Sequence, residues 1–258
     1  MKLLLEALVA GSIILGSCAS TQRQETPALE QIVNDYQRGI ILKSTAETET
    51  DPLQKRGLYN SAANAFYTAM LKRNNTYDAM IEYADCTSQS GDFNQALEWI
   101  DKAITLDKTD KAYDTKGLIC AKNGFLSLAE ECFTNAIATK DTAQYRWHRF
   151  QTRFKTAQTE NSYFEKALED IKKITEFRPE EPEGHVLLSS VYGSMALNKL
   201  DPSLARQSYN ALRSAIELID ARKKTKFNNI ENNELIALYR IQKKQFKPIK
   251  KKIEEENY

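Results

Sequence analysis

Glycine, proline and histidine are scarce in this chain of 258 residues, which contains nine Gly, six Pro and two His. So few Gly and Pro disfavour glycine-rich phosphate loops and β architectures with many turns. The two histidines, His148 and His185, leave little material for histidine-based catalysis or for zinc. Neither charge sign is in excess, because 36 Lys and Arg face 35 Asp and Glu, and this argues against a nucleic-acid-binding protein. The composition predicts a helical protein with few catalytic groups.

Common mechanistic motifs are absent as well. HExxH, GxSxG, GxGxxG and the phosphate loop GxxxxGK followed by Ser or Thr do not occur in the sequence. Carboxylates are plentiful, but a run such as Glu254–Glu256 is typical of a solvated surface rather than an acid–base pair. We therefore expect no enzymatic activity, no metal ion and no dissociable cofactor.

The first eighteen residues have the parts of a secretory signal. Lys2 precedes an uninterrupted apolar run at Ala7–Leu15, and small residues follow before Cys18. Nine residues span only about 14 Å of helix, which is less than half of a bilayer, so a transmembrane helix is disfavoured. The sequence Leu15-Gly16-Ser17-Cys18 resembles the lipobox of bacterial lipoproteins.

This resemblance implies a modification and a location. Cleavage would remove a signal peptide at residues 1–17, and the Cys18 sulfur would carry a diacylglycerol, with a further acyl chain on the new amino group. Two or more acyl chains suffice for stable anchoring. Ala19 rather than Asp follows the cysteine, which favours the outer membrane of a bacterial envelope, facing the periplasm. Residues 18–26 are then the lipidated cysteine and a polar tether.

One pattern recurs with a period of 33 or 34 residues, and it combines a Gly, an apolar residue two positions later, and two Ala columns. Its three copies are Gly57, Tyr59, Ala62, Phe66, Ala69; Gly91, Phe93, Ala96, Ile100, Ala103; and Gly124, Leu126, Ala129, Phe133, Ala136. The pattern resembles the tetratricopeptide repeat (TPR), a 34-residue helical hairpin, most clearly at Tyr77–Asp110. Small Ala side chains let two helices approach closely, and each Gly is expected to end the first helix of its copy.

Further signals extend the repeats in both directions. Thr26-Pro27, Asp51-Pro52 and Asp201-Pro202 are predicted helix starts, with the first helix reaching Ile40 and a polar loop at Thr45–Asp51. A wider Ala spacing predicts a short insertion near Gln158–Ser162. We expect an all-α, TPR-like solenoid of about five repeats and eleven helices over residues 27–220. A capping helix at 221–247 and a charged tail at 248–258 would follow.

The TPR resemblance implies a function. In that family the first helix of each hairpin contributes to a concave face that binds peptides, helices or partner domains. Applied to this sequence, the groove positions predict partner contacts, acidic at one end and basic-aromatic in the middle, at Asp78, Asp85, Lys111, Asp114, Tyr145, His148, Arg149 and Thr152. The family's carboxylate clamp is not supported, because Ile81 and Asp85 stand where it has Lys and Asn.

Two functions follow from different classes. The first is a membrane-anchored, non-catalytic adaptor that holds another envelope protein or peptide. The second resembles accessory lipoproteins that handle a small ligand with a periplasmic solute-binding protein of a transporter. That second function would need a pore or a closed pocket lined by residues such as Tyr145, His148 and Arg149, whereas an open, shallow groove would favour the adaptor.

Cys86, Cys120 and Cys132 remain after lipidation of Cys18. Cys120 and Cys132 are expected on the two helices of one hairpin, and Cys86 and Cys120 on neighbouring first helices, so either pair could form a disulfide. All three lie among helix-packing residues and are predicted to be small buried side chains. Without a CxxC pattern or a nearby His, zinc binding is not expected.

Overall fold

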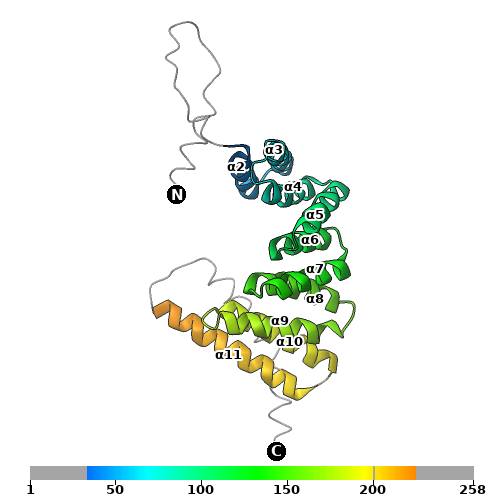
Figure 1. Ribbon diagram of the computed structural model, residues 1–258. Coiled ribbons are helices and arrows are strands. Elements are labelled where there is room, and N and C mark those ends of the chain that lie inside the picture. The colour runs from blue at the N-terminus through cyan, green and yellow to red at the C-terminus, as the bar shows by residue number, and fades with distance from the viewer. Residues whose placement is uncertain (1–33, 200, 225–258) are drawn as a thin grey trace, which may run out of the picture. The chain divides into compact units, whose positions relative to one another are not determined.

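The structure, a computed structural model, describes residues 34–199 and 201–224 (Figure 1). Over these ranges it contains ten α-helices and no strand. The helices are α2 (Asp35–Thr48), α3 (Pro52–Leu71), α4 (Thr76–Ser90), α5 (Phe93–Leu106), α6 (Asp110–Lys122), α7 (Leu126–Thr139), α8 (Ala143–Ala157), α9 (Tyr163–Phe177), α10 (Pro182–Lys199) and α11 (Pro202–Lys224). The predicted signal peptide, Cys18 and its tether lie outside the described residues, as do the predicted tail and most of the predicted capping helix.

The helices pack as consecutive antiparallel hairpins. The pairs α2–α3, α4–α5, α6–α7, α8–α9 and α10–α11 each form one hairpin, and the second helix of each hairpin packs on the first helix of the next. First helices also touch directly, α4 with α6 and α6 with α8. Figure 1 shows the described helices following one another in sequence order. This arrangement is the predicted helical-hairpin solenoid, in which each repeat contacts mainly its neighbours.

The core of each hairpin forms along the predicted alanine columns. These alanines are fully buried in all three clear copies: Ala62, Ala69, Ala96, Ala103, Ala129 and Ala136. One large side chain per copy, Phe66, Ile100 or Phe133, fills the space between the columns and is itself buried. The sequence pattern therefore predicted the interior correctly, because helix packing needs small residues where the backbones approach and a bulky one between them.

Two glycines allow a closer approach that the repeat pattern did not single out. Gly39 of α2 faces the ring of Phe66, and a Cβ at position 39 would lie 2.6 Å from that ring. Gly117 of α6 faces the ring of Phe133 in the same way, at 2.4 Å. Each distance is far inside van der Waals contact, so only glycine lets the first helix of these hairpins sit on the aromatic ring.

Two of the three predicted glycine turns are present. Gly91 ends α4 with φ +107°, and Gly124 lies in the α6–α7 turn with φ +84°, both in the left-handed region that glycine tolerates. The prediction for Gly57 was wrong, because this residue lies inside α3. Asp51 caps α3 by accepting a hydrogen bond from the Gln54 amide (2.8 Å), so the helix already begins at Pro52, as the Asp-Pro signal predicted.

The boundaries of α2 also differ from the prediction. This helix begins at Asp35, where Asn34 and Gln37 cap it reciprocally, so the helix that carries Ile40 does not extend back to Pro27. At its other end it continues to Thr48, through most of the predicted loop at Thr45–Asp51. The Thr45 hydroxyl donates to the Ile41 carbonyl (2.9 Å), which lets this polar residue stay in helix.

In the later repeats, the connection between α8 and α9 and the start of α11 lie where they were predicted. The α8–α9 connection occupies residues 158–162, where the wider alanine spacing predicted an insertion. Helix α11 begins at Pro202, and Asp201 accepts a hydrogen bond from the Ser203 amide (2.8 Å). A cap followed by proline thus marked the helix start correctly at both Asp51 and Asp201.

Candidate partner-binding face

The predicted partner-binding residues all lie on first helices of hairpins. Asp78 and Asp85 are on α4, Lys111 and Asp114 on α6, and the other four on α8. We use the name A-helix face for nine residues on the first helices α2, α4, α6 and α8. They are Lys43, Asp78, Glu82, Asp85, Lys111, Asp114, Leu118, Tyr145 and His148. The contacts below show how much of this face is free.

Acidic and basic residues alternate from α2 to α6. Lys43 of α2 forms ion pairs with Glu82 (2.7 Å) and Asp85 (2.5 Å) of α4. Lys111 of α6 approaches the same helix at Glu82 (2.9 Å) and Asp78 (3.7 Å). Burial would raise the pKa of the Glu82 carboxyl, but Lys43 and Lys111 outweigh it and lower that pKa. The acidic end of the predicted groove is therefore neutralised by lysines of the flanking repeats.

A second pair of contacts joins α6 to α8. The Tyr145 hydroxyl donates to the Asp110 carboxylate (2.9 Å), and His148 Nδ1 lies 2.7 Å from Asp114 Oδ1. Burial, and then the hydrogen bond to Asp110, raise the pKa of Tyr145. The partners in each contact lie 35 and 34 residues apart. Polar residues about one repeat apart in the sequence thus form hydrogen bonds between successive first helices.

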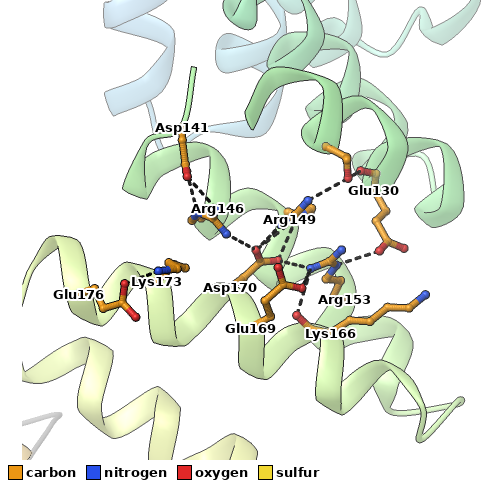
Figure 2. A network of polar contacts seen from close by, with 11 residues as sticks. Glu130, Asp141, Arg146, Arg149, Arg153, Lys166, Glu169, Asp170, Lys173 and Glu176 are labelled. Atoms are coloured by element: carbon orange, nitrogen blue, oxygen red, sulfur yellow. Dashed lines mark hydrogen bonds and ion pairs between the residues drawn. The ribbon is translucent and has the colours of Figure 1, made fainter. Parts of the chain in front are cut away.

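A buried charge cluster lies between α8 and α9 (Figure 2). Asp170 of α9 is 0% exposed and accepts hydrogen bonds from Arg149 (2.6 Å) and Arg153 (2.8 Å). Arg146 contacts the same carboxylate at 3.3 Å and pairs through two bonds with Asp141, whose pKa it lowers. The cluster extends to Glu130, which pairs with Arg153 at 2.8 Å. Its three arginines are matched by three close carboxylates, as buried charges require.

Two predicted partner-binding residues, Arg149 and Thr152, are buried. Arg149 is only 6% exposed because its guanidinium is directed at Asp170 and at the Thr134 hydroxyl. Thr152 is also buried, and its hydroxyl donates to the His148 carbonyl (3.1 Å). Partner contact at the eight residues stays a prediction, but the structure leaves these two little surface with which to make it.

Sequence reasoning missed the centre of the cluster, Asp170. A signal was present, because Asp170 lies on the same helical face as the buried residues Ala167, Ile171 and Ile174. A carboxylate inside an apolar stripe needs a partner. The three arginines of α8 supply it, at spacings of three and four residues that place them on one side of that helix.

A small pocket lies where α6, α7 and α8 meet, and we call it the His148 pocket. Its volume is about 110 Å³, and it is lined by Leu118, Ala121, Leu126, Phe133, His148, Gln151, Thr152 and Lys155. It includes two predicted partner-binding residues, His148 and Thr152, but neither Tyr145 nor Arg149. Leu118 at its edge is 39% exposed. The pocket is therefore an apolar recess on the A-helix face.

Two larger hollows share none of the predicted partner-binding residues. One, of about 580 Å³, lies beside the α4–α5 turn and is lined by Arg56, Asn60, Ser90, Gly91, Asp92, Phe93 and Asn94. The other, of about 570 Å³, is lined by Met80, Glu98, Asp101, Lys102, Thr105 and Leu106. Both hollows are open to solvent, so neither is the closed cavity that a small-ligand carrier would need.

The remaining predicted chemistry can be located only in part. Within the described ranges, no group of three or more His, Cys, Asp or Glu side chains is placed to hold a metal ion, and no helix there is both long and apolar enough to cross a membrane. Cys86, Cys120 and Cys132 are free thiols and are buried, as predicted. Cys120 and Cys132 lie on the two helices of the α6–α7 hairpin, and the neighbouring Cys120 thiol, together with burial, raises the pKa of Cys132.

Comparison with known proteins shows the fold. No family model and no curated protein matches the sequence. A crystal structure of MamA matches with a TM-score of 0.57 and 15% identity, over 76% of this chain and 98% of that chain. A second MamA crystal structure matches with a TM-score of 0.53 and 18% identity, over 67% and 95% of the two chains. The chain therefore has the TPR-like helical solenoid fold that the repeats predicted.

Proposed function

We propose that the protein is a non-catalytic adaptor, anchored to the bacterial outer membrane by a lipid on Cys18, that binds another envelope protein or peptide through the A-helix face. The observation that carries this proposal is the His148 pocket, an apolar recess on the side of the solenoid formed by first helices. Such repeats present extended surfaces that suit a polypeptide. The lipid anchor and the location rest on the resemblance of Leu15–Cys18 to a lipobox.

The ion pairs of the A-helix face support a preformed docking surface. Lys43, Glu82 and Lys111 connect three successive first helices, and Tyr145 and His148 connect a fourth. Contacts of this kind hold the helices in one arrangement before a partner arrives. Less ordering free energy is then lost on binding.

The shifted pKa values fit a structural role for these groups. Enzymes also shift pKa values, but they do so at a cleft where substrate can reach the group. Here Glu82 and Asp141 have lowered pKa values, and each carboxylate is directly bonded to a lysine or arginine. The charges therefore serve contacts within the protein, which supports an adaptor rather than an enzyme.

Handling of a small ligand is the less supported alternative. Ligand pockets in proteins commonly measure roughly 300–1,000 Å³, and the His148 pocket is about 110 Å³. Tyr145 and Arg149, which that function would bring into a common pocket with His148, bind Asp110 and Asp170 instead. An accessory role beside a solute-binding protein would then have to use protein contacts alone.

Photo-crosslinking in living cells tests the adaptor. A crosslinkable amino acid replaces Gln151, which lines the pocket and is exposed, and Lys102 on α5 serves as the control position. His148 is unsuitable because its replacement would break the contact with Asp114. We expect a discrete protein adduct from position 151 only. Equal adducts from both positions, or none from position 151, would contradict docking on this face.

Metabolic labelling tests the anchor separately. Cells fed an alkyne fatty acid should label the wild-type chain, and Cys18→Ala should abolish the label and release the protein from membrane fractions. Separation of inner and outer membranes then places the labelled chain. Labelling that persists in Cys18→Ala would refute lipidation at this residue and leave the docking face untouched.

A further inference from the structure

The walls of the His148 pocket are apolar and come from three helices. Leu118 and Ala121 are on α6, Leu126 and Phe133 on α7, and α8 closes the recess. Leu118 lines the recess and is 39% exposed, so an apolar side chain bound in the recess would cover part of it. Exposed apolar surface that is concave and bordered by polar residues is typical of an interaction site.

The size of the recess limits what can enter it. Its volume of about 110 Å³ is below the roughly 150 Å³ of an apolar cavity that holds benzene. One aliphatic side chain fits such a space, whereas a cofactor or a metabolite does not. The occupant is therefore a single side chain that projects from a longer molecule.

A charged residue at the edge of the pocket indicates which residues should flank the bound side chain in the partner. Lys155 lines the pocket and is exposed, and across residues 34–199 and 201–224 it takes part in none of the ion pairs. Among the residues that line the pocket, Lys155 is the only Lys, Arg, Asp or Glu side chain. The full charge at the pocket is thus positive, and it favours a carboxylate on the incoming segment.

We propose that the His148 pocket takes one aliphatic side chain from an acidic, extended segment of the partner protein, and that a neighbouring carboxylate of that segment pairs with Lys155. This inference rests on the proposed adaptor function and names the chemistry of its partner. The apolar side chain supplies affinity through burial. The ion pair selects acidic over basic segments and fixes the direction in which the segment lies.

Binding of synthetic peptides to the purified full chain tests the proposal. The probe is a fluorescent ten-residue peptide with one Leu flanked by Glu, and the matched probes replace the Leu by Ala, the Glu residues by Gln, or the Glu residues by Lys. We expect the acidic leucine peptide to bind best. Replacement of the Leu should weaken binding by about tenfold or more, as the loss of a buried anchor requires, and replacement of the Glu residues by Gln should weaken it by about two- to fivefold, because the ion pair with the exposed Lys155 is screened by solvent.

Variants of the protein make the test specific to the pocket. Lys155→Glu should lose the acidic peptide and gain the Lys-containing one, and Leu118→Ser should weaken both. Lys108→Glu changes the same charge at an exposed position outside the pocket and should leave all affinities unchanged. Circular dichroism and thermal unfolding confirm that each variant is folded. The exchange of preference at Lys155 cannot arise from misfolding, because a misfolded variant binds no peptide better.

Several results would overturn the proposal. Equal affinity for the acidic and Gln peptides, stronger binding of the Lys peptide to wild type, or no exchange in Lys155→Glu would each refute it. A crosslink from position 151 to this chain's own residues 248–258, or to a second copy, would assign the recess to the chain itself. If position 151 still captures a separate protein while the peptides show no acidic preference, the adaptor function stands and only the partner chemistry is wrong.

Discussion

Two kinds of contact close the hairpins of this protein. In α2–α3 and α6–α7, a glycine of the first helix lies against a phenylalanine ring of the second, at Gly39–Phe66 and Gly117–Phe133. In α8–α9 the helices are joined by arginines around the buried carboxylate of Asp170. The α8–α9 hairpin therefore adds a buried ionic cluster to an apolar core that includes Phe150 and Phe164. The difference is that the ionic cluster fails severely if a single partner is lost.

The largest effect is expected from Asp170→Asn. The substitution keeps the volume but leaves Arg146, Arg149 and Arg153 without their shared counter-charge, so we expect the free energy of unfolding to fall by about 3–5 kcal/mol. Urea denaturation measures it. Glu169→Ala is the control, because Glu169 is exposed and 3.7 Å from Arg153. A loss in Asp170→Asn no larger than in the control would show that the cluster does not hold this hairpin.

Gly117→Ala tests the apolar counterpart. A Cβ at this position meets the Phe133 ring at 2.4 Å, and overpacking of this kind lowers stability by about 1–3 kcal/mol. Gly57→Ala is the matched control, because Gly57 also lies in a helix but has no atom within 4 Å of the added Cβ. There we expect stabilisation of about 0.5–1 kcal/mol. Effects of the same sign at both positions would remove the argument for a close approach at Gly117.

A smaller effect is expected where charges join neighbouring repeats instead of closing a hairpin. Lys43→Met removes a cation from Glu82 and Asp85, but Glu82 keeps Lys111. We expect a loss of about 1 kcal/mol because the pair is partly exposed. Lys108→Met, at an exposed position, should be neutral in the same denaturation experiment. A loss as large as that of Asp170→Asn would erase the distinction between the two uses of charge.

The smallest effect concerns pH. The pKa of Glu82 is lowered in the folded protein from its ordinary 4.5, so the unfolded chain binds this proton first as the pH falls. The stabilisation by Glu82 is complete above about pH 4.5 and is lost as the pH falls through the lowered value. Stability measured from pH 7 to pH 3 should therefore decline less steeply in Glu82→Gln than in wild type. An identical or steeper decline in the variant would contradict the assigned direction.

Helix positions were predictable wherever a local signal decided them. The alanine columns marked the buried faces, and Asp51 and Asp201 marked helix starts together with the prolines that follow them. Prediction failed at Gly57, because the same glycine can end a helix or lie within one, and the cap at Asp51 determined which. Local residues thus locate helices, while competing local signals leave their ends open.

The candidate site was predictable only as a set of positions. Counting along the repeat placed His148 and Thr152, which line the pocket, on first helices. It could not show that Arg149 is directed away from that face toward Asp170, 21 residues along the chain. Nor could it show that Asp85 and Lys111 are engaged by α2 and α4. Such pairings depend on which helices become neighbours.

The sequence by itself determined the fold, because the repeat period and the alanine columns specify hairpins whose contacts are almost all between neighbours. It also supplied the residues of the predicted lipid anchor. Only the tertiary structure decided which charged side chains form ion pairs within the protein and which remain available to a partner. The physical reason is that an ion pair depends on the distance between side chains of different helices, and burial strengthens it. In the folded protein Lys155 lies beside an apolar recess, whereas Asp170 is buried within hydrogen-bonding distance of three arginines.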